Sequence, residues 1–196
     1  MKLAWLAATL CLIGLSPGAA QWREAPRPES PRQAEDAIYE DINAYRASMG
    51  LPAVSRSRSL DRVARAHVVD LETWHADQGT DARGIACNSH SWSSHGNWTP
   101  VCYTPDHAYA ANMWNKPAQV THGAYPGYGF EIAFGQSGAV IDADEAMRGW
   151  ESSSAHNAVI LERGVWRGAH WQAMGVGMYR GYAVVWFGKE PDTARE

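Results

Sequence analysis

The chain has 196 residues and a net charge of −4 at neutral pH, and its acidic and basic side chains are interspersed rather than gathered in blocks. This length allows one domain with a substantial core and is short for two. Because binding to nucleic acid needs a concentrated stripe of basic residues, the composition excludes that class of function.

The first residues are typical of an export signal. Lys2 supplies a positive charge, an apolar run follows from 3 to 15, and small residues occupy 16–20. This pattern predicts a signal peptide over residues 1–20, and therefore a secreted or periplasmic protein. No segment reaches the ~20 apolar residues that span a bilayer, so we expect no transmembrane anchor. Residues 21–33, which hold three prolines, are predicted to form a flexible linker.

Two helices are predicted in the first half of the domain. Ser30 followed by Pro31 is typical of a helix N-terminus, and apolar residues then recur at helical spacing over 33–49. The second helix is expected over 59–75, and His67 lies on its apolar face. We interpret His67 as a half-buried histidine of that face, with a role in a functional site as the alternative.

Regular periodicity disappears over 78–127, and long ordered loops of this kind are often functional. Cys87 and Cys102 form an even pair in an exported chain, so we expect a disulfide, with two free thiols as the alternative. The disulfide would close a loop of about 15 residues and stabilise the fold by roughly 3 kcal/mol. Most tryptophans are expected to pack this loop, with Trp92 and Trp98, beside His90 and His95, as the expected exceptions at the rim of a binding surface.

Regular structure resumes with a short strand over 128–134 and a third helix over 142–154, for which Asp142 is the expected cap. Two strands follow over 174–180 and 182–187, with Gly181 in the turn between them. Helices that come first and strands that are not in regular βαβ alternation predict an α+β fold.

Several local patterns occur in an order that resembles one known family. They are Asn43-Ala44-Tyr45-Arg46 followed by Gly50-Leu51-Pro52, the helix carrying Ala66-His67, the run from Trp150 to Leu161 with its serine-rich turn and His156, and Gly175-Val176-Gly177 before Trp186-Phe187-Gly188. Together they resemble the CAP superfamily (cysteine-rich secretory, antigen 5 and pathogenesis-related proteins) in a bacterial secreted form. The resemblance implies a CAP domain over 34–190, folded as an α-β-α sandwich with a central antiparallel sheet.

The resemblance also implies a polar cleft, which in this family holds two histidines and two glutamates. His156 matches the C-terminal cleft histidine, Glu131 stands in for the glutamate of a Gly-Glu-Asn motif, and His90 stands in for the upstream histidine. Ser153 occupies the position of the second glutamate, so the chain carries a triad rather than a tetrad.

Two chemical interpretations of this triad stay open. His90, His156 and Glu131 can hold a divalent metal, zinc first, with a position left for water or ligand. Alternatively, the histidines bind Glu131 directly and join helices to sheet, with no cofactor. The serines near His156 lack a nucleophile elbow, so a serine hydrolase is not expected.

Three functions follow, in order of preference. The first is a secreted binding module, the second is a metal-assisted, peptidase-like hydrolase acting on an extracellular or envelope substrate, and the third is a structural scaffold. The missing second glutamate removes the expected general base, which favours binding over hydrolysis. We expect a monomer whose partner is a lipid, a glycan or a protein.

Overall fold

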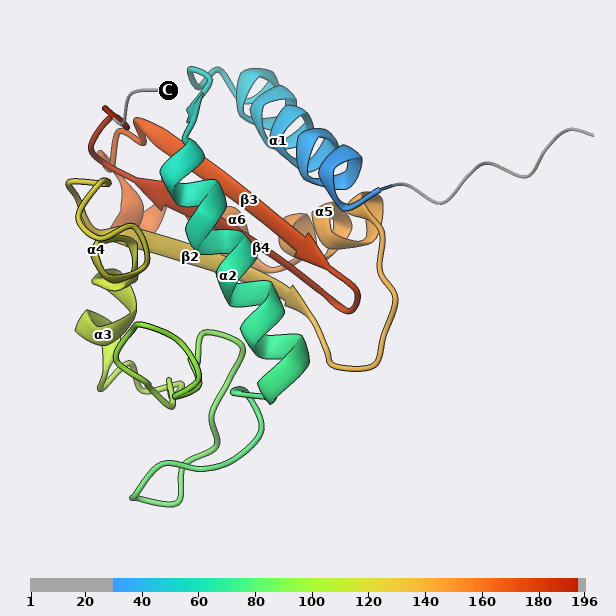
Figure 1. Ribbon diagram of the computed structural model, residues 1–196. Coiled ribbons are helices and arrows are strands. Elements are labelled where there is room, and N and C mark those ends of the chain that lie inside the picture. Colours follow the sequence, from blue (N-terminus) through green and yellow to red (C-terminus); the bar gives the residue numbers. More distant parts are fainter. Residues whose placement is uncertain (1–29, 194–196) are drawn as a thin grey trace, which may run out of the picture.

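The computed structural model describes residues 30–193 (Figure 1). Its elements in chain order are α1 (Pro31–Ser48), β1 (Ser55–Arg56), α2 (Arg58–Trp74), α3 (Ala110–Trp114), α4 (Lys116–Val120), β2 (Gly129–Gly135), α5 (Ala143–Ser152), α6 (Ser154–Ile160), a 3-10 turn η1 (Gly164–Trp166), β3 (Ala173–Tyr179) and β4 (Tyr182–Gly188). The expected signal peptide lies outside the described residues, as does the expected linker up to residue 29. Within 30–193, none of the helices is both long and apolar enough to cross a membrane.

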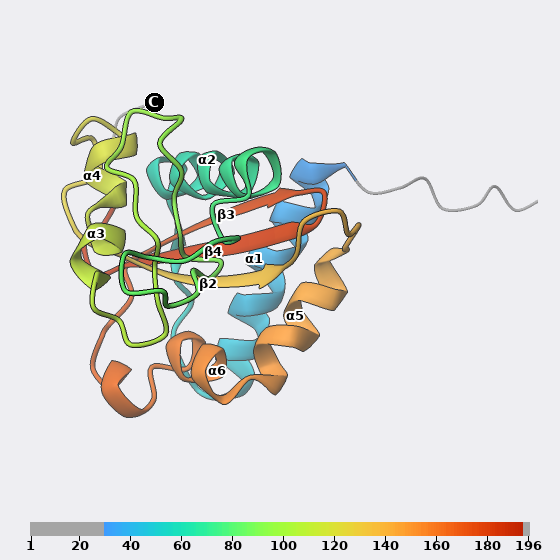
Figure 2. The ribbon, with the colours of Figure 1, turned by 90° about the horizontal axis from the view of Figure 1, so that it is seen from below.

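The molecule has three layers, with the sheet in the middle (Figure 2). The strand order is β1-β3-β4-β2, with antiparallel pairing except between the two-residue β1 and β3. α2 covers one face, while α1, α5 and α6 cover the other. Alternate residues of β4 enter the two resulting cores, since Val184 and Trp186 face α2 while Val185 and Phe187 face the opposite helices. This is the predicted α-β-α sandwich.

The predicted helix starts are confirmed in detail. The Ser30 hydroxyl accepts a hydrogen bond from the Gln33 N–H, and the Gln33 side chain accepts one from the Ser30 N–H. Asp142 makes the same reciprocal contact with Glu145 at the start of α5. α1 therefore begins at Pro31, within the range expected for the linker, because the cap and the proline favour a helix there.

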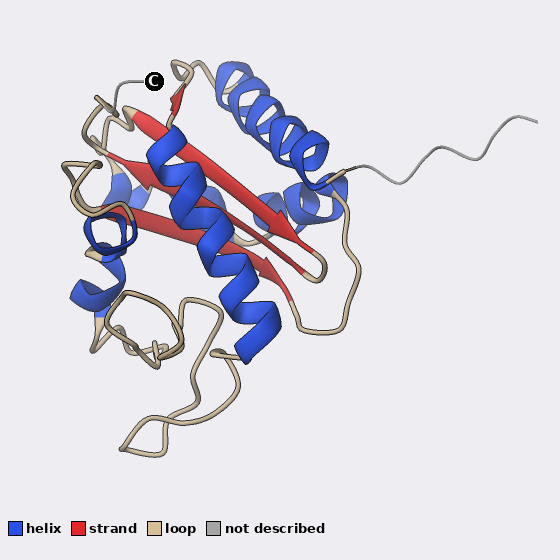
Figure 3. Cartoon of the chain, in the orientation of Figure 1, coloured by secondary structure: helices blue, strands red, loops and turns tan. Residues whose placement is uncertain are grey.

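The segment between α2 and α3 is a long loop, as expected (Figure 3). Four short elements lie outside the sequence-based prediction, namely β1, α3, α4 and η1, and none exceeds five residues. The third predicted helix corresponds to α5, and an unpredicted helix, α6, follows it because Ser153 is extended and its hydroxyl caps α6. The serine-rich turn is thus the start of a new helix rather than the end of the old one.

α2 lies unusually close to β3, and two glycines make this possible. A Cβ atom on Gly175 would lie 2.1 Å from the backbone carbonyl carbon of Leu60, and one on Gly177 would lie 2.4 Å from that of Ala64. Side chains at these positions would push α2 away from the sheet. The Gly175-Val176-Gly177 pattern is therefore explained by the close packing of α2 on β3.

Two buried carboxylates accept hydrogen bonds from the outer edge of β3. The short strand β1 pairs with this edge only at one end. Asp61 accepts a hydrogen bond from the Val176 N–H at 2.8 Å, and Glu35 accepts one from the Met178 N–H at 3.4 Å. Arg56 binds Asp61 in turn, and Arg65 binds Glu35. Helix side chains thus satisfy strand N–H groups that would otherwise be unpaired.

We predict that Gly177→Ala lowers the free energy of unfolding by about 3 kcal/mol, because the new methyl group meets helix backbone that cannot move aside. Urea denaturation followed by circular dichroism measures this loss. Gly127→Ala is the matched control, since its methyl group meets the side chain of exposed Glu190 and makes only ordinary contact with the ring of Tyr125. Equal stability of the two variants would contradict the proposed close approach of α2.

Candidate functional site

A buried glutamate on β2 forms the centre of the candidate site. Glu131 Oε1 lies 2.5 Å from His67 Nδ1, and Glu131 Oε2 lies 2.8 Å from His90 Nδ1. The side chains of Glu131 and His67 are fully buried, whereas that of His90 is 19% exposed. One carboxylate therefore joins the sheet, α2 and the loop that follows α2.

The surroundings of His67 fix its protons. Its Nε2 lies 2.9 Å from the carbonyl oxygen of Ser91, which can only accept, so Nε2 carries a proton. Nδ1 faces a carboxylate, so a second proton lies between His67 and Glu131. Burial alone would raise the pKa of Glu131, but the charge of His67 and the hydrogen bonds from both histidines hold that pKa below its ordinary value of 4.5. The pair is therefore an imidazolium facing a carboxylate.

His67 is a direct partner of Glu131, whereas the sequence-based interpretation treated it first as a packing residue of the helix. It is fully buried rather than half-buried, and its ring stacks on Trp92 with centroids 4.1 Å apart. Trp92 is only 2% exposed, so its expected place at a cleft rim is wrong. The stacking and the ion pair together fill the space between α2 and the sheet.

His90 is held with one nitrogen available. Its Nδ1–H donates to Glu131, which leaves Nε2 as an acceptor or metal ligand. The backbone N–H of His90 donates to Asn88 Oδ1 at 3.0 Å, and the edge-on ring of Tyr103 lies 5.4 Å away. Glu131 thus orients the ring of His90 in the way that a carboxylate orients a ligand histidine.

His156 approaches the same region from α6. Burial lowers the pKa of His156 below 6.5, and the charge of nearby His90 lowers that pKa further. Ser153 Oγ accepts a hydrogen bond from the His156 N–H at 3.5 Å. The position of the family's second glutamate is therefore taken by a helix cap, and Glu151 nearby is exposed. The structure brings His90 and Glu131 into contact and places His156 near His90.

The donor set limits what the site can hold. Among residues 30–193, no three His, Cys, Asp or Glu side chains are arranged around a common metal position. Both oxygens of Glu131 are already engaged, whereas a zinc ion usually takes at least three protein ligands. The predicted set of His90, Glu131 and His156 therefore does not fit as a three-ligand site. The two imidazoles fit a weakly held cation whose other positions are taken by water or ligand.

Lys116, whose ammonium group lies over the ring of Trp92, is a second buried charge near the site. Its Nζ donates to the carbonyl oxygen of Thr99 at 2.5 Å and lies 5.5 Å from the centre of the Trp92 ring. Burial lowers the pKa of Lys116 to about 8, although the charges of Asp70 and Glu131 act in the opposite direction. The ammonium group therefore opposes folding until it loses its proton.

The loop that carries His90 is braced covalently and by ion pairs. Cys87 and Cys102 form the expected disulfide. Arg83 donates to Asp81 and to Asp106 at 2.7 Å each, which connects the two ends of this loop. These contacts supply the order that regular secondary structure does not provide.

The family of the chain follows from this fold and site. Residues 39–184 match the model of the CAP (cysteine-rich secretory protein) family, which covers more than half of the chain. The protein therefore belongs to the CAP family. No curated protein matches the sequence.

Three solved structures share the fold. An extracellular protein of Bacillus anthracis that contains an SCP domain is 18% identical, with a TM-score of 0.55 over 84% of this chain. A cysteine-rich secretory protein of Staphylococcus aureus is 15% identical, with a TM-score of 0.50 over 84% of this chain, and an outer surface protein of Borrelia burgdorferi is 16% identical, with a TM-score of 0.50 over 82%. The match covers 45% and 40% of the first two proteins and 96% of the third.

We predict that Glu131→Gln lowers the free energy of unfolding by about 3 kcal/mol, because it leaves the buried imidazolium of His67 without its counter-charge. Chemical denaturation at pH 7 measures the loss. Glu151→Gln, at an exposed glutamate, is expected to unfold like the wild type. A Glu131→Gln protein as stable as the wild type would show that His67 is not charged.

The buried lysine gives a prediction for alkaline pH. The folded pKa of about 8 lies below the ordinary value of 10.5, so the unfolded chain binds more protons between these values. The free energy of unfolding should therefore rise as the pH increases from 7 to 9.5, by about 2 kcal/mol. Lys116→Met should remove this rise, and denaturation at both pH values in the two proteins tests it. A rise of the same size in Lys116→Met would contradict the assignment.

Proposed function

We propose that the protein is an extracellular binding module whose cleft is formed around His90 and His156. The observation that carries this proposal is that both oxygens of Glu131 are engaged by histidines. Glu131 is therefore a positioning residue for His90 rather than a free ligand or general base. The names of the Bacillus and Borrelia structural neighbours, which place those proteins outside the cell, support the extracellular location.

The cleft offers two imidazoles with different surroundings. His90 presents Nε2, and no hydrogen-bond partner for that atom occurs within the described part of the chain. The pKa of His156 is lowered by burial and by His90, so at neutral pH this ring is uncharged and able to bind a cation or accept a hydrogen bond. We propose that a divalent cation, zinc first, binds between these rings and helps to hold a ligand.

One observation supports hydrolysis as the second candidate function. A carboxylate that holds His90 Nδ1–H leaves Nε2 basic, which is the arrangement of a general base. However, a metal-assisted peptidase also needs a third metal ligand, and Ser153 caps a helix where the family's glutamate would be. A pure scaffold, the third candidate, is disfavoured by the partial exposure of His90.

Zinc titration calorimetry of the protein from residue 21 onward tests the proposal. We expect one weakly bound zinc ion per chain, with binding lost in His90→Ala and in His156→Ala and little change in the melting temperature of His156→Ala. His95→Ala removes an exposed histidine outside the cleft and serves as the matched control. No binding by the wild type, or an equal loss in the control, would contradict the cation site. Cleavage of fluorogenic casein by the zinc-loaded wild type but not by His90→Ala would support the hydrolase instead.

A further inference from the structure

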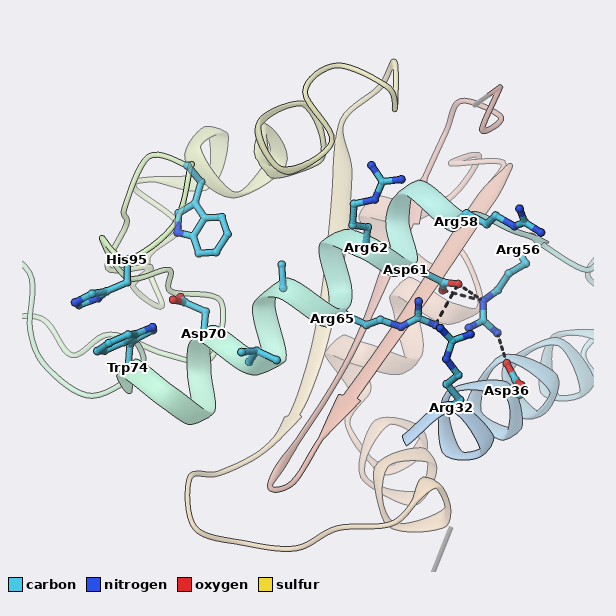
Figure 4. Close-up of a pocket in the computed structure, with 13 residues that line it drawn as sticks. Arg32, Asp36, Arg56, Arg58, Asp61, Arg62, Arg65, Asp70, Trp74 and His95 are labelled. Carbon is cyan, nitrogen blue, oxygen red and sulfur yellow. Dashed lines mark hydrogen bonds and ion pairs between the residues drawn. The ribbon is translucent and has the colours of Figure 1, made fainter. Parts of the chain in front are cut away.

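A groove of about 950 Å³ runs along the outer face of α2, the face that is turned away from the sheet (Figure 4). It is lined by residues of α2 from Arg58 to Trp74, together with residues of α1 and of the loop after α2. At 1.5 Å per helical residue, the distance between those two positions is about 24 Å. We call this hollow the α2 groove. Its length suits an extended ligand rather than a single small molecule.

One end of the α2 groove is cationic. Five arginines line the groove against three aspartates, and the arginines gather at this end in Figure 4. Arg56 and Arg65 are held by the carboxylates that complete the edge of β3. Arg32 and Arg62 are exposed, and their side chains make no ion pair or hydrogen bond with any other residue of the described chain. These two guanidinium groups are therefore free to bind an anion through paired N–H donors.

The other end of the α2 groove is aromatic. Trp74 is 50% exposed and stacks on His95 with ring centroids 3.7 Å apart and planes within 5° of parallel. Trp98 lies beside them, and its indole N–H donates to the Ser93 carbonyl oxygen at 2.9 Å. Asp70 accepts hydrogen bonds from the backbone and the side chain of Ser93, which fixes the loop that presents His95. This end is thus a preformed flat surface.

We propose that the α2 groove binds an acidic polysaccharide chain. Flat, partly exposed indole rings suit the apolar C–H face of a sugar, and free guanidinium groups suit its carboxylate or sulfate groups. The chemistry also separates this ligand from the alternatives. A nucleic acid would need many more unpaired cations, and membrane insertion would need protruding apolar side chains, whereas these aromatic rings line a hollow.

The α2 groove is independent of the candidate site around Glu131 and His90. The inner face of α2 carries His67 and the contact with Glu131, whereas the α2 groove is lined by the opposite face of the same helix. A ligand in the α2 groove therefore contacts neither His90 nor His156. The two sites can be tested separately.

Isothermal titration with size-defined heparin oligosaccharides, which carry sulfate and carboxylate, and with oligogalacturonates, which carry carboxylate only, tests the proposal. We expect at least one of these two ligands to bind, with affinity that falls as salt is raised. Arg62→Glu should weaken binding by about tenfold or more, and Trp74→Ala should weaken it by a similar factor. Binding of heparin oligosaccharides but not of oligogalacturonates would identify sulfate as the group recognised. His156→Ala should bind these oligosaccharides as the wild type does, whatever its behaviour toward zinc.

Matched controls distinguish binding at the α2 groove from nonspecific electrostatic attraction to the protein surface. Arg148→Glu makes the same charge change at an exposed position on α5, and Tyr128→Ala removes an exposed aromatic ring elsewhere. Both should retain full affinity. Equal losses in Arg62→Glu and Arg148→Glu, or full affinity in Trp74→Ala, would overturn the proposal. Binding to phosphatidylserine vesicles without binding to either oligosaccharide would overturn it in favour of a membrane surface.

Discussion

The structure depends on one buried carboxylate. Glu131 lies in the layer between α2 and the sheet, where an ionised group is costly unless it is paired and hydrogen-bonded. His67 supplies the counter-charge from the helix, and His90 supplies a second donor from the loop. Since these partners come from three separate segments, none of them can move without leaving a buried charge unsatisfied. The contact therefore fixes the helix, the loop and the strand relative to one another.

This arrangement gives α2 two roles that do not interfere. Its inner face is drawn against β3, where Gly175 and Gly177 let the backbones approach, and it delivers His67 to Glu131. Its outer face is free to carry the arginines and the aromatic residues of the α2 groove. A rigid helix held from within is a good support for an outer binding surface, because its side chains keep their spacing.

Local chemistry made much of the fold predictable. The helix caps at Ser30 and Asp142, the apolar stripe of α2 and the two C-terminal strands all depend on residues near one another in the chain. The role of His67 was less accessible, because a histidine on an apolar stripe has the same pattern whether it packs or binds a charge. The useful signal is that a buried imidazole needs partners for two nitrogens and a buried carboxylate needs donors. The α2 groove was not predictable, since residues of α1, of α2 and of the loop after α2 line it together only in three dimensions.

The hydrogen-bonded edge of β3 has a consequence for the association of one chain with another. An open strand edge is a template on which another chain can add a strand, and this leads to aggregation. Here the N–H groups of Val176 and Met178 already donate to Asp61 and Glu35, so an incoming strand would have to displace two carboxylates held by arginines. Inward-facing charge therefore protects the part of the β3 edge that β1 does not cover.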